Sequence, residues 1–134
     1  MHLQNQFWHR FIKELPQYSL DCVASLDEVQ ENFRRYGLLK ENVVFLKGWF
    51  AQSLPKLPSH CRFSVIRIDA DWYQSTMDAL IHTYPKLTTG GFVIIDDYKL
   101  PGCRKAVDTF RAQKRIKNPI SIADEKAGVV FWRK

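Results

Sequence analysis

The chain has 134 residues, a formal charge of +6 and a hydrophobic fraction of 46%. This size and composition suit one soluble globular domain, 1–134, and no apolar run approaches the roughly 20 residues that a membrane-spanning helix needs. The three cysteines (Cys22, Cys61 and Cys103) form no CxxC pair, so we expect free thiols and no zinc site. The first residues lack the apolar core of a signal peptide, which favours a cytoplasmic location.

The first third of the chain predicts two helices. Apolar residues spaced along 3–14 predict an amphipathic helix that packs on its own domain or docks a partner. Ser25 and Glu28 have the spacing of a capping box, and Gly37 with Leu38 has the pattern of a helix stop. A second helix is therefore predicted over 26–36.

A short buried strand is predicted over the apolar run 43–46, followed by Gly48 and Trp49. A glycine after a strand allows a sharp turn or the close approach of a ligand. Trp49 has the shape to stack on a flat ring, or it is a core or lid aromatic. Residues 51–62, which contain two prolines, are predicted to be a connection.

The centre of the chain, 63–98, predicts a β-α-β unit with two parallel strands, because two apolar runs flank a segment with a helical pattern. The first strand ends at Asp69 and the second at Asp96 and Asp97. The helix between them begins near Ser75 and ends at Pro85. The glycine pair 90–91 is predicted to be the turn that leads into the second strand, and not a phosphate loop.

The remaining segments predict a helix over 103–116 and two closing strands, 120–122 and 128–132. About five residues separate these strands, which fits an antiparallel hairpin and not a parallel crossover. Positive charge gathers in the predicted helix and after it. Such a surface attracts nucleic acid or an anionic substrate, or it is a solvated helix face. No aromatic-interleaved RNA-binding pattern accompanies it, so we expect neither a nucleic-acid partner nor a membrane partner.

Asp69, Asp96 and Asp97 follow strands that are predicted to be neighbours. They should converge at the carboxyl ends of these strands, where open α/β sheets bind ligands. Carboxylates about 4 Å apart repel one another by roughly 4 kcal/mol at an effective dielectric constant near 20, so the group needs a proton or a cation. Hard cations such as Mg²⁺ prefer oxygen ligands of this kind. The alternative is that these acids are helix caps and solvated loop ends.

Several short motifs occur in a specific order: Ile68-Asp69-Ala-Asp71-Trp-Tyr73-Gln-Ser-Thr76, Tyr84-Pro-Lys-Leu87, Gly90-Gly91, Ile95-Asp96-Asp97-Tyr98 and Cys103-Arg-Lys-Ala106-Val107. In this order and spacing they resemble the macrocin O-methyltransferase family, whose members methylate sugar hydroxyls of antibiotics. The resemblance covers roughly residues 18–134.

The resemblance implies a Rossmann-like class I methyltransferase sheet, S-adenosylmethionine as methyl donor, Mg²⁺ as cofactor and a small sugar-containing acceptor. It assigns the metal ligands to Asp69, Asp96 and Asp97 and the general base to Asp71. The chemistry agrees, because a metal lowers the pKa of a bound hydroxyl and a nearby carboxylate can then accept its proton. The remaining assignments are cofactor contacts for Gly48, Trp49 and Asp69, and an acceptor pocket, or plain aromatic packing, for Trp72, Tyr73 and Tyr98.

Compared with the family, we expect a partial α/β sheet: mostly parallel, with a C-terminal antiparallel hairpin, and lacking the first two strands and their Gly-rich turn. The 63–69 strand would then have an unpaired edge. Three outcomes are open for this edge: the 43–46 strand pairs with it directly, another chain covers it, for example in a homo-oligomer, or the chain is an unstable fragment. Cofactor binding by this chain alone should be weak or absent. Two other functions stay open. One is a metal-dependent glycosyltransferase, and the other is a non-catalytic binding or assembly module.

Overall fold

The computed structural model describes residues 24–134. The chain divides into two compact units, Met1–Phe45 and Leu46–Lys134, which are described separately below. The helix expected over 3–14 lies outside the described residues, as does Cys22. The single-domain organisation expected from the sequence stays a prediction.

In the first unit, helix α2 spans Leu26–Arg35 and has both of the predicted end signals. The Ser25 side chain accepts a hydrogen bond from the Glu28 amide, and the Glu28 carboxylate accepts one from the Ser25 amide. At the other end, Gly37 has a positive φ of 66°, and its amide and that of Leu38 donate to carbonyls of the last turn. These two bonds form a Schellman motif, so local sequence alone specifies this helix.

The strand predicted over 43–46 is wrong. These residues are irregular, and Val44 is 84% exposed. A short apolar run becomes a strand only when another strand provides hydrogen-bond partners for its backbone. No strand among the described residues pairs with 43–46.

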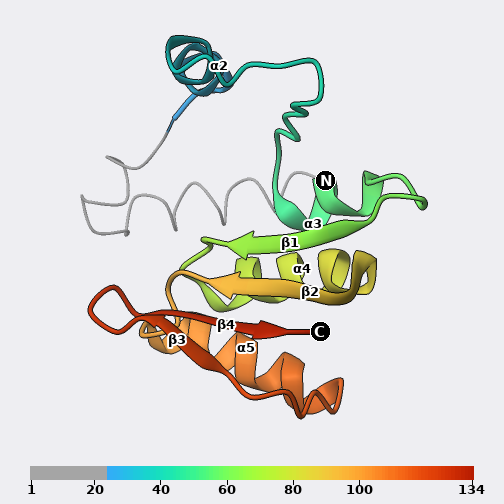
Figure 1. The fold of residues 1–134 in the computed structure, drawn as a ribbon, viewed down its shortest axis with the longest axis vertical. Coiled ribbons are helices and arrows are strands. Elements are labelled where there is room, and N and C mark those ends of the chain that lie inside the picture. The colour runs from blue at the N-terminus through green and yellow to red at the C-terminus, as the bar shows by residue number, and fades with distance from the viewer. Residues whose placement is uncertain (1–23) are drawn as a thin grey trace, which may run out of the picture. The chain divides into compact units, whose positions relative to one another are not determined.

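The second unit contains a mixed sheet of four strands: β1 (Phe63–Ile68), β2 (Leu87–Ile95), β3 (Ser121–Asp124) and β4 (Val129–Arg133). Their order is β1-β2-β4-β3 (Figure 1). As predicted, β1 and β2 are parallel, and β3 and β4 form an antiparallel hairpin that joins the sheet alongside β2. The α/β fold class expected from the sequence is confirmed, with a partial sheet that ends in an antiparallel hairpin.

The helices of this unit are α3 (Phe50–Ser53), α4 (Tyr73–Thr83) and α5 (Pro101–Gln113), with short 3₁₀ turns η2 (Leu54–Lys56) and η3 (Tyr84–Lys86). The expected connection over 51–62 therefore contains helical turns. Helix α4 begins two residues earlier than expected, because the Ser75 hydroxyl donates to backbone carbonyls and does not cap the helix. Helix α5 also begins two residues early, at Pro101, whose fixed φ suits the first helical position.

The glycine pair 90–91, expected to be a turn, lies within β2. The pairing with β1 is irregular here, because Phe63 is opposite Leu87 while Val65 is opposite Phe92. Gly90 has a positive φ of 83°. A Cβ atom on Gly91 would lie only 2.8 Å from the Ser64 carbonyl oxygen. The pair therefore accommodates a bulge inside a strand. Glycine is typical of both bulges and turns, so the sequence alone does not distinguish them.

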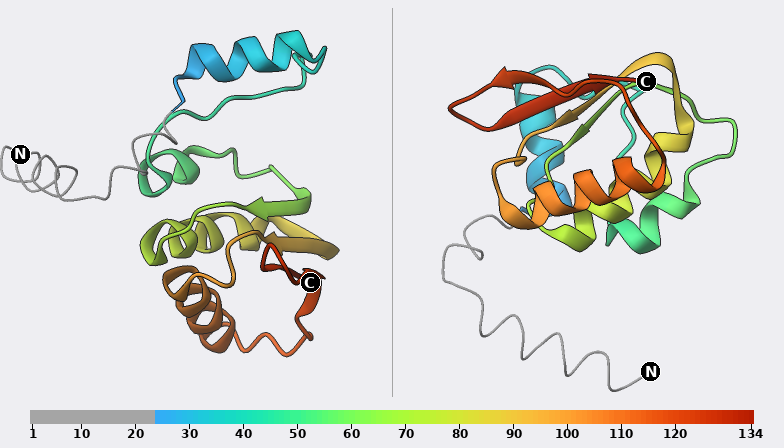
Figure 2. Two further views of the ribbon diagram at one scale, coloured as in Figure 1. Left: turned by 90° about the vertical axis from the view of Figure 1, so that its left-hand side faces the viewer. Right: turned by 90° about the horizontal axis from the view of Figure 1, so that it is seen from below.

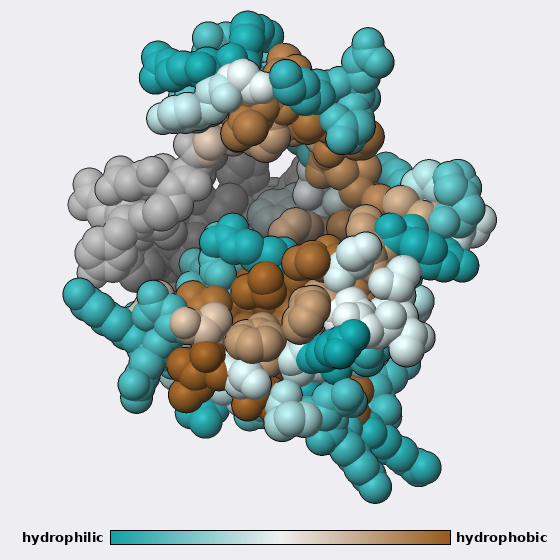
Figure 3. Space-filling model, viewed as in Figure 1, coloured by the Kyte–Doolittle hydropathy of each residue, from teal (hydrophilic) through white to brown (hydrophobic). Residues whose placement is uncertain are grey.

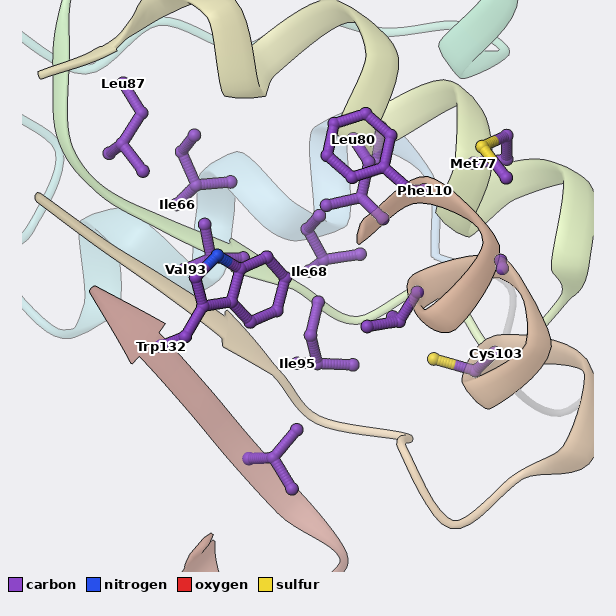
Figure 4. Close-up of a cluster of buried hydrophobic side chains, with 14 residues drawn as sticks. Ile66, Ile68, Met77, Leu80, Leu87, Val93, Ile95, Cys103, Phe110 and Trp132 are labelled. Carbon is purple, nitrogen blue, oxygen red and sulfur yellow. The ribbon is translucent and has the colours of Figure 1, made fainter. Parts of the chain in front are cut away.

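The core lies between the sheet and helices α4 and α5, which cover the same face (Figure 2). Alternate residues of the strands point toward the helices, as Ile66 and Ile68 do on β1 and Val93 and Ile95 do on β2 (Figure 4). Helix α5 contributes an inner face of Ala106, Val107 and Phe110, together with Cys103. This packing fixes the carboxyl ends of β1 and β2 relative to each other.

The opposite face of the sheet exposes apolar side chains, among them Val65 at 53% and Phe92 at 38% (Figure 3). Strand β1 lies at an edge, with β2 as its neighbour among the strands that the structure describes. Across residues 24–134, no helix is long and apolar enough to cross a membrane.

Candidate active site

Three carboxylates meet at the carboxyl ends of the parallel strands. Asp69 follows β1 directly, and Asp97 follows β2 after Asp96, whose amide donates to the Ile68 carbonyl over 3.0 Å and extends the pairing of the two strands. Asp71 lies in the turn between β1 and α4. One carboxylate oxygen from each of Asp69, Asp71 and Asp97 lies within 4.8 Å of the others. The expected convergence of Asp69 and Asp97 is therefore present in the structure, but the third member of the group is Asp71, whereas the prediction had Asp96.

The turn that carries Asp71 has an unusual backbone. Its φ is +46°, a left-handed value, and the Trp72 amide donates to the Ala70 carbonyl across it. This is a tight three-residue turn, and such strained conformations cost energy and cluster at functional sites. Gly102 of α5 packs closely beneath it, because a Cβ atom there would lie 3.2 Å from the Tyr73 nitrogen. The backbone therefore fixes the direction of the Asp71 side chain.

Arg67 is a member of the site that sequence reasoning missed. Its guanidinium forms an ion pair with Asp96 and lies 3.3 Å from a carboxylate oxygen of Asp69. The Asp96 side chain is 17% exposed and that of Asp69 58%. A signal was present in the sequence, since Arg67 lies two residues before Asp69 in a strand and must therefore point to the same face.

Like charges and burial perturb the acids in this group. Burial raises the pKa of the Asp69 carboxyl, and the nearby Asp96 and Asp97 raise it further, while Arg67 lowers it. Burial also raises the pKa of the Asp97 carboxyl, reinforced by its hydrogen bond to Asp71 and by the charges of Asp71 and Asp96. One arginine thus offsets only part of the repulsion among four neighbouring acids. An added proton or a divalent cation would relieve the remainder.

The residues present fit a magnesium ion. The donors are all carboxylate oxygens, the ligand type that a hard cation prefers. Asp97 also has one oxygen, Oδ2, that is buried and accepts no hydrogen bond from the part of the chain that the structure describes. Leaving a buried acceptor unsatisfied is costly, and a bound cation would satisfy it. Asp69 and Asp97 lie where they could hold such an ion, and Asp96 borders it while paired with Arg67.

The three aromatic residues proposed for an acceptor pocket differ in their exposure and in their contacts. Trp72 precedes α4 directly and is 50% exposed. Tyr73 packs partly against the core, with the Lys105 ammonium 6.0 Å from its ring centre. The Tyr98 hydroxyl donates to Asp108 over 2.7 Å, and the Arg104 guanidinium lies 5.1 Å from its ring centre. Burial and this hydrogen bond raise the pKa of the Tyr98 phenol.

The two cofactor-contact residues expected before α3 lie in a turn. Gly48 has a positive φ of 137°, and Trp49 is the N-cap residue that precedes α3 and is 69% exposed. Helix α3 packs against α4, the helix that follows the Asp71 turn. Their assignment as cofactor contacts stays a prediction, as do the roles of the acids and aromatics.

The chain matches the family model described as macrocin O-methyltransferase over residues 13–134. It is 47% identical over 122 residues to a mycinamicin III 3''-O-methyltransferase from Micromonospora griseorubida, covering 90% of this chain and 47% of that protein. It is 51% identical over 108 residues to a tetracenomycin rhamnosyl 4'-O-methyltransferase from Streptomyces olivaceus, covering 81% of this chain and 40% of that protein. The chain therefore spans less than half the length of these curated relatives.

Solved structures agree with this relationship. The O-methyltransferase NovP superimposes with a TM-score of 0.78 at 44% identity, over 83% of this chain and 45% of that one. The calicheamicin methyltransferase CalS11 superimposes with a TM-score of 0.65 at 17% identity, over 83% of this chain and 53% of that one, which shows a shared fold.

Proposed function

This chain belongs to the macrocin O-methyltransferase family, and on that premise we propose that it carries the acidic part of a site that transfers a methyl group from S-adenosylmethionine to a sugar hydroxyl. The acceptor would be a small glycosylated natural product, because the curated relatives are named for acceptors of that kind. Mg²⁺ would be the cofactor. The observation that carries the proposal is the convergence of Asp69, Asp71 and Asp97 within 4.8 Å.

We propose that Asp69, Asp96 and Asp97 hold the metal ion. Asp69 and Asp97 are already close together, and the buried Oδ2 of Asp97 has no hydrogen-bond partner among the described residues, so a bound cation would satisfy it. A bound magnesium ion would supply Lewis acidity that lowers the pKa of the acceptor hydroxyl. Burial and the repulsion among the acids raise the pKa of Asp69 and Asp97, and both effects favour the binding of a cation here.

Asp71 would then accept the proton of the acceptor hydroxyl at a carboxylate oxygen. Its strained turn is the argument for this role, because the backbone holds the side chain toward the acid group. A base placed within hydrogen-bond reach typically contributes 10²–10⁴-fold to the rate. Trp72, which is exposed next to it, would cover one face of the sugar ring and help to exclude water.

Binding and transfer can be tested separately. S-adenosylhomocysteine is titrated calorimetrically into the folded 134-residue chain with and without Mg²⁺, and methyl transfer to mycinamicin III is followed with labelled S-adenosylmethionine. We expect Mg²⁺ to bind and cofactor binding to be weak, because the sequence offers no Gly-rich turn for it. The Asp71→Asn variant should keep both binding steps and lose any transfer.

A folded chain that binds neither Mg²⁺ nor S-adenosylhomocysteine would overturn the proposal. The non-catalytic alternative, a binding or assembly module, would then be the better description. The glycosyltransferase alternative loses its support, since the three curated relatives are all O-methyltransferases.

A further inference from the structure

The guanidinium of Arg67 contacts carboxylates that are also proposed to bind the metal ion, so the two positive charges would repel each other. Its guanidinium contacts the carboxylates of Asp69 and Asp96, and these are two of the three side chains proposed as metal ligands. It arises from β1, which also leads into Asp69, so it is anchored next to the group it contacts. Among the described residues, Arg67 is the cation in ion-pair contact with the acids at the ends of β1 and β2.

We propose that Arg67 acts as a tethered counter-cation that competes with the metal ion for Asp69 and Asp96. This inference rests on the proposed metal site and assigns Arg67 as a positioning residue within it. While Arg67 is engaged, Asp96 pairs with it, and the three-acid group consists of Asp69, Asp71 and Asp97. Entry of a divalent cation releases Asp96 from Arg67, and the guanidinium turns toward solvent on the open face of the sheet.

The geometry allows this exchange. The Arg67 side chain is 60% exposed, so it can leave the acids without being buried elsewhere. Because side chains alternate along β1, Arg67 lies on the face of the sheet away from α4 and α5, as does the exposed Val65. The Asp96 amide donates a hydrogen bond to the Ile68 carbonyl, so the backbone keeps the Asp96 carboxylate at the site when the arginine moves.

Two consequences distinguish a competing arginine from a merely structural one. Removing the charge of Arg67 should strengthen metal binding, because the metal ion no longer has to displace the guanidinium or bind next to its positive charge. The same change should destabilise the metal-free chain, because four acids lose their counter-charge. Metal should therefore raise the melting temperature of the variant more than that of the wild type, since stabilisation grows with affinity.

The experiment compares wild type with Arg67→Gln and Arg67→Lys by calorimetric titration of Mn²⁺ and Mg²⁺ into the full chain after removal of metal with a chelator. We expect Arg67→Gln to bind metal on the order of fivefold more tightly, the scale of an exposed ion pair. Arg67→Lys keeps the charge and should stay close to wild type. The matched control is Arg133→Gln, which removes the same charge from the same face of the sheet, where the guanidinium lies 5.9 Å from the Phe92 ring centre.

Thermal unfolding of the same variants, with and without Mg²⁺, provides a second measurement that needs no enzymatic activity. Equal or weaker metal binding by Arg67→Gln would overturn the inference while leaving the metal site itself intact. So would an equal gain in Arg133→Gln, which would point to net charge alone. Failure of every variant and of wild type to bind either metal would instead count against the proposed cofactor, and with it the role of Arg67.

Discussion

Replacing Asp97 by asparagine should stabilise the metal-free protein at neutral pH. The substitution keeps the shape of the side chain and removes one negative charge from a group in which three carboxylate oxygens lie within 4.8 Å. The asparagine can also place its amide nitrogen at the position of the buried Oδ2 of Asp97, an oxygen that accepts no hydrogen bond from the described residues. The same change removes a proposed metal ligand, so stability and metal binding should move in opposite directions.

The size of the effect follows from the spacing. At 4.8 Å, two unit charges repel by about 0.9 kcal/mol in water and about 3.5 kcal/mol at an effective dielectric constant of 20. Because Asp69 and Asp71 are both exposed, the lower figure is the better guide. Relief of two such pairs should add about 1–2 kcal/mol to the free energy of unfolding. For a domain of this size, that raises the melting temperature by roughly 5–10 °C.

Thermal unfolding followed by circular dichroism in the presence of a chelator measures this gain. The pKa of Asp97 is raised in the folded state, so the wild-type free energy of unfolding falls as pH rises from the ordinary 3.8 through the raised value. The advantage of Asp97→Asn should therefore be full near neutral pH and disappear at about pH 4. A matched control is Asp78→Asn in α4, which keeps its bond to Gln74 and lies outside the three-acid group. A gain that persists at low pH, or one that the control shares, would refute the electrostatic reasoning.

Three further predictions concern parts of the fold that position the site. Gly91→Ala should lower the free energy of unfolding in urea by about 1–3 kcal/mol, because its Cβ would lie 2.8 Å from the Ser64 carbonyl oxygen. In the control Gly37→Ala, the new Cβ meets no atom within 4 Å, so the loss should be smaller and come from backbone strain alone. Ser25→Ala should lower the stability of α2 by about 1 kcal/mol and accelerate amide hydrogen exchange there, without changing exchange in β2. Equal protection of α2 in the wild type and the variant would contradict the capping assignment. In a spectrophotometric titration, Tyr98 should ionise above its ordinary pKa of 10.0, so the free energy of unfolding should fall as pH rises beyond about 10. Asp108→Asn should lower the pKa of Tyr98, and an unchanged titration would show that the hydrogen bond has no effect.

The features that sequence predicted well depend on near neighbours. Helix α2 is specified by Ser25, Glu28 and Gly37, all within a few residues of its ends. The β-α-β unit follows from two apolar runs and the helical pattern between them. The convergence of Asp69 and Asp97 then follows from parallel pairing, which places strand ends side by side.

The features that sequence missed depend on partners elsewhere in the chain. Residues 43–46 have the composition of a strand, yet a strand exists only with another strand beside it. Gly90 and Gly91 have the composition of a turn, and only the mismatch between β1 and β2 shows that they form a bulge. The engagement of Asp96 by Arg67 could have been expected from the alternation of side chains along β1. It was missed because the acids alone were considered.

The contact between Gly102 and the Asp71 turn bears on how such a site can change its substrate. The first turn of α5 supports the proposed base from below, while Arg104 and Asp108 on the same helix hold Tyr98. These parts are fixed by backbone packing and by internal contacts, so they tolerate little variation. Trp72 and Lys105 are exposed beside them. If Asp71 is the base, a change of acceptor would be expected to involve exposed positions such as these, and not Gly102.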